Sequence, residues 1–172
     1  SDVASTSEDD CFLRCDVVQY KFRNETTKIE TCIDCEPGYS CDGQSSVECD
    51  AGTYCTGGRK AFCAPGKYGE TRTAANESQA CNFCNAGRYQ ISSGQTLCTK
   101  CDAGRYSNKT GQVNRQECQL CTLPGHYCPE GTPNADEYPC AKGTYSNKSQ
   151  ATSCKICEEG LYQEEPGQAS CM

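Results

Sequence analysis

The chain has 172 residues, of which 19 are cysteine, and its net charge is −7. Leu, Ile, Val and Phe together number only 18, which excludes a single large hydrophobic core and with it a compact enzyme. Disulfides or metal ions must therefore supply the stability. The acidic charge argues against binding to nucleic acid or anionic membranes, and no stretch is apolar enough to cross a bilayer.

In chain order, the composition predicts turns and short irregular β-hairpins, because Gly, Ser, Asn and Pro are too frequent for long helices. One helical turn is expected near Thr73 to Ala75. The predicted fold class is a small disulfide-rich protein, an elongated rod of tandem cysteine-rich modules with little helix and no large hydrophobic core. The expected segments are an acidic flexible leader (1–10), a divergent N-terminal module (11–34), two short Gly-Tyr-Cys modules (35–62), three regular repeats (63–120), a short variant module (121–139) and two C-terminal repeats (140–172), the last of them truncated.

The modules are defined by the motif Cys-x-x-Gly-x-Tyr, which recurs at a mean spacing of about 17 residues. The copy at Cys35 lacks the spacer residue, the copy at Cys121 has one extra, and a degenerate copy begins at Cys15. Units this small are expected to stack in an array in which each touches only its neighbours. The invariant positions of the eight copies are Gly38, Gly52, Gly66, Gly87, Gly104, Gly125, Gly143 and Gly160, and Tyr39, Tyr54, Tyr68, Tyr89, Tyr106, Tyr127, Tyr145 and Tyr162.

The copies serve as an internal alignment of the chain with itself. The residue between Gly and Tyr varies among Thr, Lys, Arg, His and Leu, which predicts a solvent-exposed side chain. The glycine never varies, so its backbone must adopt a positive φ or leave no room for a Cβ. The tyrosine is predicted to be the main hydrophobic body of each module, with its ring on a nearby disulfide.

Five Cys-x-x-Cys pairs raise three chemical interpretations. The spacings Cys84 to Cys98 and Cys101 to Cys118 suit a zinc ribbon, but Cys98 and Cys101 would then have to serve two sites. A thioredoxin-like site would need a β-α-β context that the sequence lacks. Composition and repetition favour disulfides, hence an oxidising compartment, with no catalytic or metal-binding residue and no cofactor.

The repeat also predicts which cysteines pair. The first cysteine of each Cys-x-x-Cys would close the loop behind it, and the second would open the next module. The predicted pairs are Cys63–Cys81, Cys84–Cys98, Cys101–Cys118, Cys140–Cys154, Cys157–Cys171 and Cys15–Cys32.

The remaining cysteines leave two schemes open. Pairing between nearest neighbours would join Cys35 to Cys41, Cys49 to Cys55 and Cys121 to Cys128. Interlaced pairing would instead join Cys35 to Cys49 and Cys41 to Cys55, and it would give Cys140 a new partner in Cys121 and Cys128 a partner in Cys154. Cys11 is unmatched, which predicts either a bond to another chain or a cut from a longer array.

Four Asn-x-Ser/Thr sequons support an extracellular protein with N-linked glycans: Asn24, Asn76, Asn108 and Asn147. Asn108 and Asn147 lie at the same offset, four residues after a repeat glycine. The only histidine, His126, is expected at the surface. The carboxylates at 8–10 and 164–165 are expected to be solvated, and Arg88 with Arg105 would form at most a faint basic stripe.

The array of Cys-x-x-Gly-x-Tyr and Cys-x-x-Cys resembles the ephrin-receptor-like cysteine-rich repeat from about Cys32 to Cys171. It also resembles the opening module of tumour-necrosis-factor-receptor cysteine-rich domains. The resemblance implies an extracellular rod of disulfide-bonded hairpins, of the kind found in surface-coat and ciliary-hair (mastigoneme-like) proteins.

The sequence therefore predicts a non-enzymatic extracellular structural or adhesive rod, a repeat segment of a larger surface, matrix or filament glycoprotein. Its partners would be other extracellular protein subunits. The alternative is the ligand-binding ectodomain of a receptor similar to the tumour-necrosis-factor or ephrin receptors.

Overall fold

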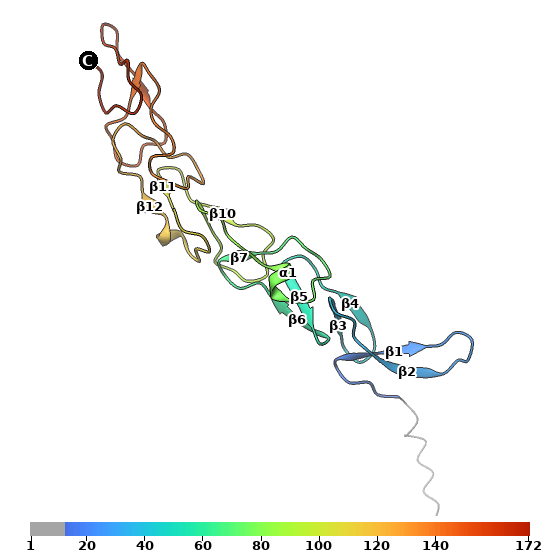
Figure 1. Cartoon of the computed structure of the whole chain (residues 1–172). Coiled ribbons are helices and arrows are strands. Elements are labelled where there is room, and N and C mark those ends of the chain that lie inside the picture. The colour runs from blue at the N-terminus through green and yellow to red at the C-terminus, as the bar shows by residue number, and fades with distance from the viewer. Residues whose placement is uncertain (1–12) are drawn as a thin grey trace, which may run out of the picture.

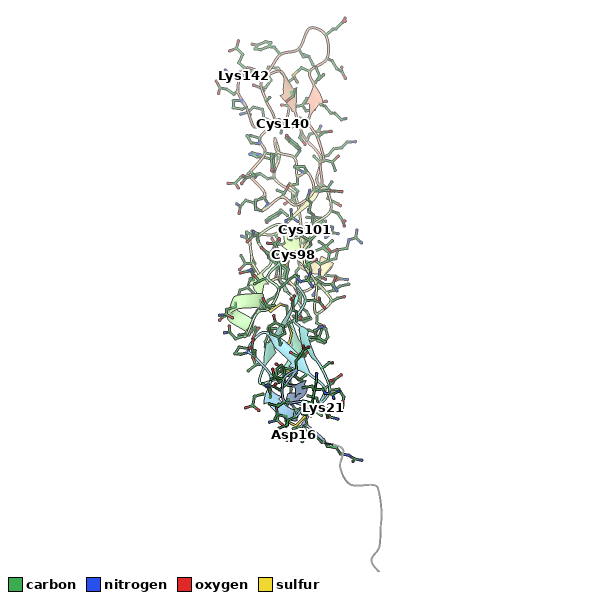
Figure 2. All side chains as sticks on the ribbon, turned by 90° about the vertical axis from the view of Figure 1, so that its right-hand side faces the viewer. Asp16, Lys21, Cys98, Cys101, Cys140 and Lys142 are labelled. Carbon is green, nitrogen blue, oxygen red and sulfur yellow. A yellow bond between two sulfur atoms is a disulfide. The ribbon has the colours of Figure 1, made fainter. Side chains whose placement is uncertain are left out.

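The protein is a narrow rod in a computed structural model that describes residues 13–172 (Figure 1). The hairpins follow one another along the long axis in chain order. A view turned by 90° shows the same narrow outline, with Asp16 and Lys21 near one end, Cys101 in the middle and Cys140 toward the other end (Figure 2). The predicted fold class is confirmed, while the leader predicted at 1–10 lies outside the described residues.

Every sheet in the described part of the chain is a two-stranded antiparallel hairpin. In the regular modules each strand has only two residues. The first strand holds the spacer and tyrosine of Gly-x-Tyr, and the second holds the two residues inside Cys-x-x-Cys; Lys67 pairs with Phe83 and Tyr68 with Asn82. The repeated motif and the repeated hairpin are therefore the same unit.

The hairpins, in chain order, are β1 (Gln19–Arg23) with β2 (Glu30–Asp34), β3 (Tyr39–Cys41) with β4 (Ser46–Glu48), β5 (Thr53–Thr56) with β6 (Arg59–Phe62), β7 (Lys67–Tyr68) with β8 (Asn82–Phe83), β9 (Arg88–Tyr89) with β10 (Thr99–Lys100), β11 (Arg105–Tyr106) with β12 (Gln119–Leu120), and β13 (Thr144–Tyr145) with β14 (Lys155–Ile156).

Helical structure is limited to α1 (Glu77–Ala80) and the 3-10 turn η1 (Arg115–Glu117) among the described residues. The predicted helical turn at Thr73 to Ala75 is wrong in position. Thr73 has a φ of 53°, in the left-handed region, so no right-handed helix can pass through it. The helix begins after Asn76, whose side-chain oxygen accepts a hydrogen bond from the Gln79 amide at 3.1 Å.

The buried apolar side chains of the described part are almost all half-cystines, ten of them, joined only by Ala74 and Ala80. Tyr54 packs against the cluster that Cys63 forms with these two alanines. Phe62 and Phe83 remain 58 and 60% exposed. The disulfides thus occupy the place that aliphatic side chains take in an ordinary core.

Candidate functional site

Within residues 13–172 the rod is stapled by nine disulfides, which join all eighteen cysteines of that part of the chain. The structure joins all six pairs proposed from the repeat. For the others it shows the nearest-neighbour scheme, not the interlaced one. The pairs are Cys15–Cys32, Cys35–Cys41, Cys49–Cys55, Cys63–Cys81, Cys84–Cys98, Cys101–Cys118, Cys121–Cys128, Cys140–Cys154 and Cys157–Cys171.

The disulfides bear directly on the zinc interpretation. Both sulfurs of each of the five Cys-x-x-Cys pairs are bonded to other cysteines, so they are not thiolate ligands for a metal. Between residues 13 and 172 there is also no cluster of three or more His, Cys, Asp or Glu side chains suited to a metal. Cys11 lies outside the described residues.

We name each module by the cysteine that begins its Cys-x-x-Gly-x-Tyr motif. Within a module, these residues form a tight turn. In the Cys84 module, the Arg88 amide donates to the Asn85 carbonyl at 3.1 Å, and Gly87 has a φ of 77°. A positive φ at the third turn position defines a type II turn and favours glycine there. The motif therefore sets the turn that starts each hairpin from β3–β4 onward.

Six of the seven junctions between neighbouring modules carry a backbone ladder that uses the same positions. The Gly87 amide donates to the carbonyl of Ser107, the residue after the next module's tyrosine, at 2.7 Å. The Ser107 amide in turn donates to the Thr132 carbonyl in the Cys121 module, and the Cys101 amide donates to the Gly87 carbonyl. The glycine amides that follow this pattern, with their acceptors, are Gly38 (Cys55), Gly66 (Gln90), Gly87 (Ser107), Gly104 (Cys128), Gly125 (Ser146) and Gly143 (Gln163).

A second left-handed position recurs in the loops of six modules, seven residues after the repeat glycine in five of them and six after Gly125. Its amide donates to the first cysteine of the preceding module, as Gly111 does to Cys84 at 2.8 Å. Sequence reasoning missed this position, although its repeated offset was a usable signal. Its occupants are Thr73, Gly94, Gly111, Gly131, Gln150 and Gly167.

The carbonyl of this second position packs against the repeat glycine of the module two steps earlier. The Gly131 oxygen occupies the place where a Cβ on Gly87 would lie, and the Gln150 oxygen lies 2.8 Å from the ideal Cβ position of Gly104. The repeat glycine is thus required for both its positive φ and this close approach. The six glycines in this contact, with their carbonyl partners, are Gly38 (Thr73), Gly52 (Gly94), Gly66 (Gly111), Gly87 (Gly131), Gly104 (Gln150) and Gly125 (Gly167).

This contact corrects the expectation that each module touches only its neighbours. The loop between the cysteines of one module is long enough to reach past the adjacent module. Three successive modules are therefore in mutual contact along the rod.

The variability of the residue between Gly and Tyr predicted a solvent-exposed side chain, and this prediction is wrong for all modules except the last. Thr53 is buried and the others except Leu161 are half-buried, because their polar ends bond within the module. Arg88 donates to the Cys98 carbonyl at 3.1 Å and Arg105 to the equivalent Cys118 carbonyl at 2.8 Å. The two arginines thus support the hairpins.

A buried polar residue follows the tyrosine in several modules and was also missed. Gln90 is 7% exposed, and its side chain donates to the Leu97 carbonyl at 2.7 Å. Gln163 does the same to Ser170 at 2.8 Å. These amides satisfy buried backbone groups and hold each loop against its hairpin. Two glutamines at the same repeat offset were the available signal.

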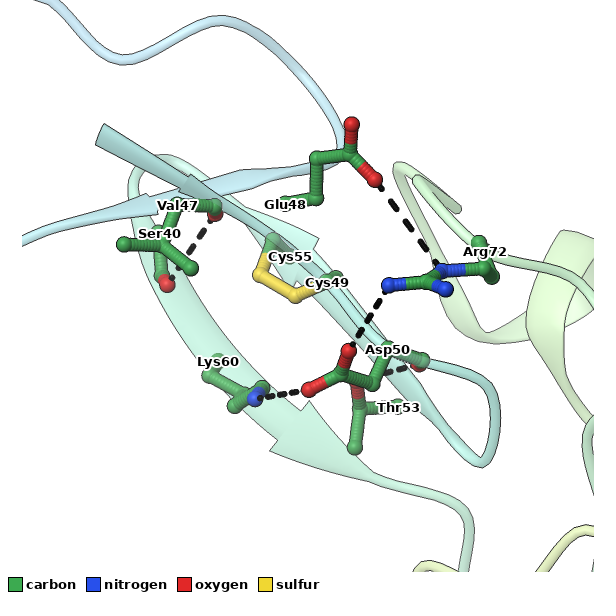
Figure 3. Close-up of polar contacts among 9 residues, drawn as sticks. All are labelled: Ser40, Val47, Glu48, Cys49, Asp50, Thr53, Cys55, Lys60 and Arg72. Atoms are coloured by element: carbon green, nitrogen blue, oxygen red, sulfur yellow. Dashed lines mark hydrogen bonds and ion pairs between the residues drawn. A yellow bond between two sulfur atoms is a disulfide. The ribbon is translucent and has the colours of Figure 1, made fainter.

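Charged side chains link the Cys49 and Cys63 modules on the surface (Figure 3). Asp50 lies 3.3 Å from Lys60 and 3.2 Å from Arg72, and Arg72 also lies 4.0 Å from Glu48. These side chains are substantially exposed, so each pair contributes little stability, of order 0 to 1 kcal/mol.

The repeat tyrosines are half-buried in seven modules, whereas Tyr162 in the last module is 56% exposed. Tyr127 also packs against Tyr138 in a tilted arrangement, with ring centroids 5.6 Å apart. His126 is half-buried, with its Nδ1 3.0 Å from the Pro124 carbonyl.

The four sequon asparagines, Asn24, Asn76, Asn108 and Asn147, are all exposed, as are Glu164 and Glu165. The acidic cluster at 8–10 lies outside the described residues.

Tandem hairpins, a disulfide core and a backbone ladder define a disulfide-rich repeat protein. Residues 66–118 match the family described as tyrosine-protein kinase ephrin type A/B receptor-like, which confirms the ephrin-receptor-like resemblance for that segment. This family is a non-catalytic extracellular module, and the disulfides likewise indicate an extracellular location. No curated protein matches the chain. No helix among residues 13–172 is long and apolar enough to cross a membrane.

Proposed function

We propose that this chain is a non-enzymatic extracellular structural or adhesive rod, a repeat segment of a larger surface, matrix or filament glycoprotein. The observation that carries the proposal is the contact between modules two steps apart, as between Gly87 and Gly131. A chain of units in contact only with their neighbours can bend at every junction. Contact across three units resists such bending, because two junctions must open together.

The disulfides suit the same role. Six of the loops span 14 to 18 residues and stay closed until a reductant is present. Load along the rod can therefore separate modules but cannot unravel them. Glycans on the four exposed sequons would shield the surface from proteases, and the partners would be other extracellular subunits.

Pulling on the full chain from its two ends in a single-molecule force experiment tests this proposal. Without reductant, we expect no extension steps as long as an opened disulfide loop. With reductant, steps from loops of 14 to 18 residues should appear. Small-angle scattering of the same protein should give a radius of gyration well above the roughly 16 Å of a compact domain of this length.

Loop-sized steps in the absence of reductant, or a compact radius of gyration, would contradict the rod. Saturable capture of one soluble protein ligand along the chain would instead support the receptor ectodomain.

A further inference from the structure

The last module leaves open the backbone groups that six of the seven earlier modules use to bind the next one. In the Cys140 module, the Gly143 amide donates to Gln163 and the Ser146 amide donates to Gln168. In the Cys157 module, the equivalent amides are those of Gly160 and Gln163, and neither donates to any backbone carbonyl within residues 13–172. The carbonyl of Cys157 likewise accepts no backbone hydrogen bond there.

Two side chains at the same end, Tyr162 and Ile156, are more exposed than their counterparts in interior modules. Tyr162 is 56% exposed, whereas Tyr145 is half-buried. Ile156 is 80% exposed and Met172 is 62% exposed. Phe83, which occupies the position of Ile156 in its own module, is 60% exposed and packs its ring edge over Gly111.

The repeat glycines give the same result independently. Six of them are buried, Gly143 is half-buried and Gly160 is exposed. An ideal Cβ on Gly143 or on Gly160 would meet no atom within 4 Å. For Gly143, the missing neighbour is the carbonyl of a second left-handed position two modules farther along.

We infer that the end of the Cys157 module is a docking face for one further Cys-x-x-Gly-x-Tyr module carried in tandem. The face continues the interface that already joins the interior modules, with the same donors, acceptor, apolar side chains and open glycines. The occupant must therefore present the same carbonyls and amides as an interior module. The inference goes beyond the rod function and holds equally for a receptor ectodomain.

A second copy of this chain, docked end to end, does not meet that requirement. Its first described unit is a longer hairpin in which Lys21, the residue after Tyr20, pairs with Cys32 inside the unit. In the interior modules the backbone amide and carbonyl of the equivalent residue, such as Gln90 or Ser107, form hydrogen bonds with neighbouring modules. The N-terminal unit thus offers a different face.

The test adds one module to the full chain by repeating residues 156–171 directly after Met172. This restores a Cys-x-x-Cys step at Cys171 and supplies a new Gly-x-Tyr turn and a copy of Gly167. Hydrogen exchange should slow at least tenfold at the Gly160 and Gln163 amides. The control is the same extension with both of its added cysteines changed to serine, in which these two amides should exchange as in the natural chain.

A glycine pair provides the sharper control. In the natural chain, Gly143→Ala should cost only the strain of a left-handed alanine. In the extended chain it should also cancel the tenfold protection, because its Cβ would collide with the loop of the added module. Gly160→Ala should not cancel it, because Gly160 would meet only a second added module. A second extension, which repeats residues 139–154, repeats the measurement with a different module.

The inference is overturned if both added modules close their disulfides and the two amides remain unprotected. Failure of both to close their disulfides also counts against it, because a complementary face should help a module to fold. Protection of the two amides in the natural chain, with concentration-dependent sedimentation, would show a second copy on this face and would equally overturn it.

Discussion

The Cys84 and Cys157 modules share a motif and a loop of the same length, yet they differ in burial. Their disulfides both span 14 residues. Cys84 is fully buried and Gly87 is buried, whereas Cys157 is half-buried and Gly160 is exposed. The difference shows that neighbouring modules bury the core of each unit. The module is the unit of the sequence, but three successive modules are the unit of packing.

The largest expected effect comes from removing a disulfide in each of the two modules. Cys84→Ala with Cys98→Ala, and Cys157→Ala with Cys171→Ala, remove loops of equal length, so the entropic loss should be about 3 kcal/mol in both. The interior variant should lose more, because it also empties buried space that other modules contact. Hydrogen exchange resolved along the chain measures both losses.

Equal losses of stability in the two disulfide variants would contradict the conclusion that neighbouring modules bury the core of an interior module. The spread of the damage is the second readout: the interior change should expose amides in the adjoining modules, and the terminal change should expose few outside residues 157–172.

The repeat glycines should give the next largest difference. Gly160→Ala should cost about 1 kcal/mol, the strain of a left-handed alanine. Gly87→Ala should cost at least twice as much, because the Gly131 oxygen already occupies the place of the new Cβ. Proteolytic susceptibility of each variant under mild denaturant provides the measurement, and comparable susceptibility would contradict the packing role of the glycine.

The buried glutamines should show no such difference. Gln90→Ala and Gln163→Ala each remove two side-chain hydrogen bonds inside the module, one donated to a loop carbonyl and one accepted from a loop amide, so each should cost about 2 kcal/mol locally. Local exchange rates in residues 92–97 and 165–170 test this. A much larger cost at Gln90 would show that its side chain also serves the contact between modules.

A stabilising change is expected at the second left-handed position. Gln150 has a φ of 60°, where four other modules place glycine. Gln150→Gly should relieve this strain and raise local stability by a few tenths to about 1 kcal/mol, after allowance for the greater freedom of glycine in the unfolded chain. Gln168→Gly, at the next loop position of the following module, is the control and should not stabilise. A loss of stability in Gln150→Gly measured by exchange would disprove the strain argument.

The smallest effect lies in the turn after Cys41, outside both compared modules. The Ser45 and Gln44 amides hold the pKa of the Asp42 carboxyl below its ordinary 3.8. Because the pKa of Asp42 is lower in the folded chain than in the unfolded one, the ionised carboxylate stabilises the fold. This stabilisation is fully present above pH 3.8 and is lost as the pH falls through the folded pKa. Amide chemical shifts of residues 44 and 45 should follow this titration, and Asp42→Asn should remove it. Persistence of the titration in Asp42→Asn would assign it to another group.

Much of the rod could be predicted from the sequence because a repeat compares the chain with itself. The invariant glycine predicted either a positive φ or no room for a Cβ, and the φ is positive at all eight repeat glycines. The alternation of cysteines predicted pairs such as Cys63–Cys81. The choice between nearest-neighbour and interlaced pairing for Cys35 and Cys49 stayed open, since both schemes close short loops.

The cysteine content and the motif by themselves determined the class of fold, the hairpin unit and the order of modules, because local turns and loop closures depend on residues near one another in the chain. Only the tertiary structure decided how the modules pack. The spacer residue looked exposed by its variability, yet Arg88 and Thr53 turn their polar ends inward. The carbonyl of Gly131 reaches Gly87 across an intervening module, a contact between distant residues that depends on how successive modules stack.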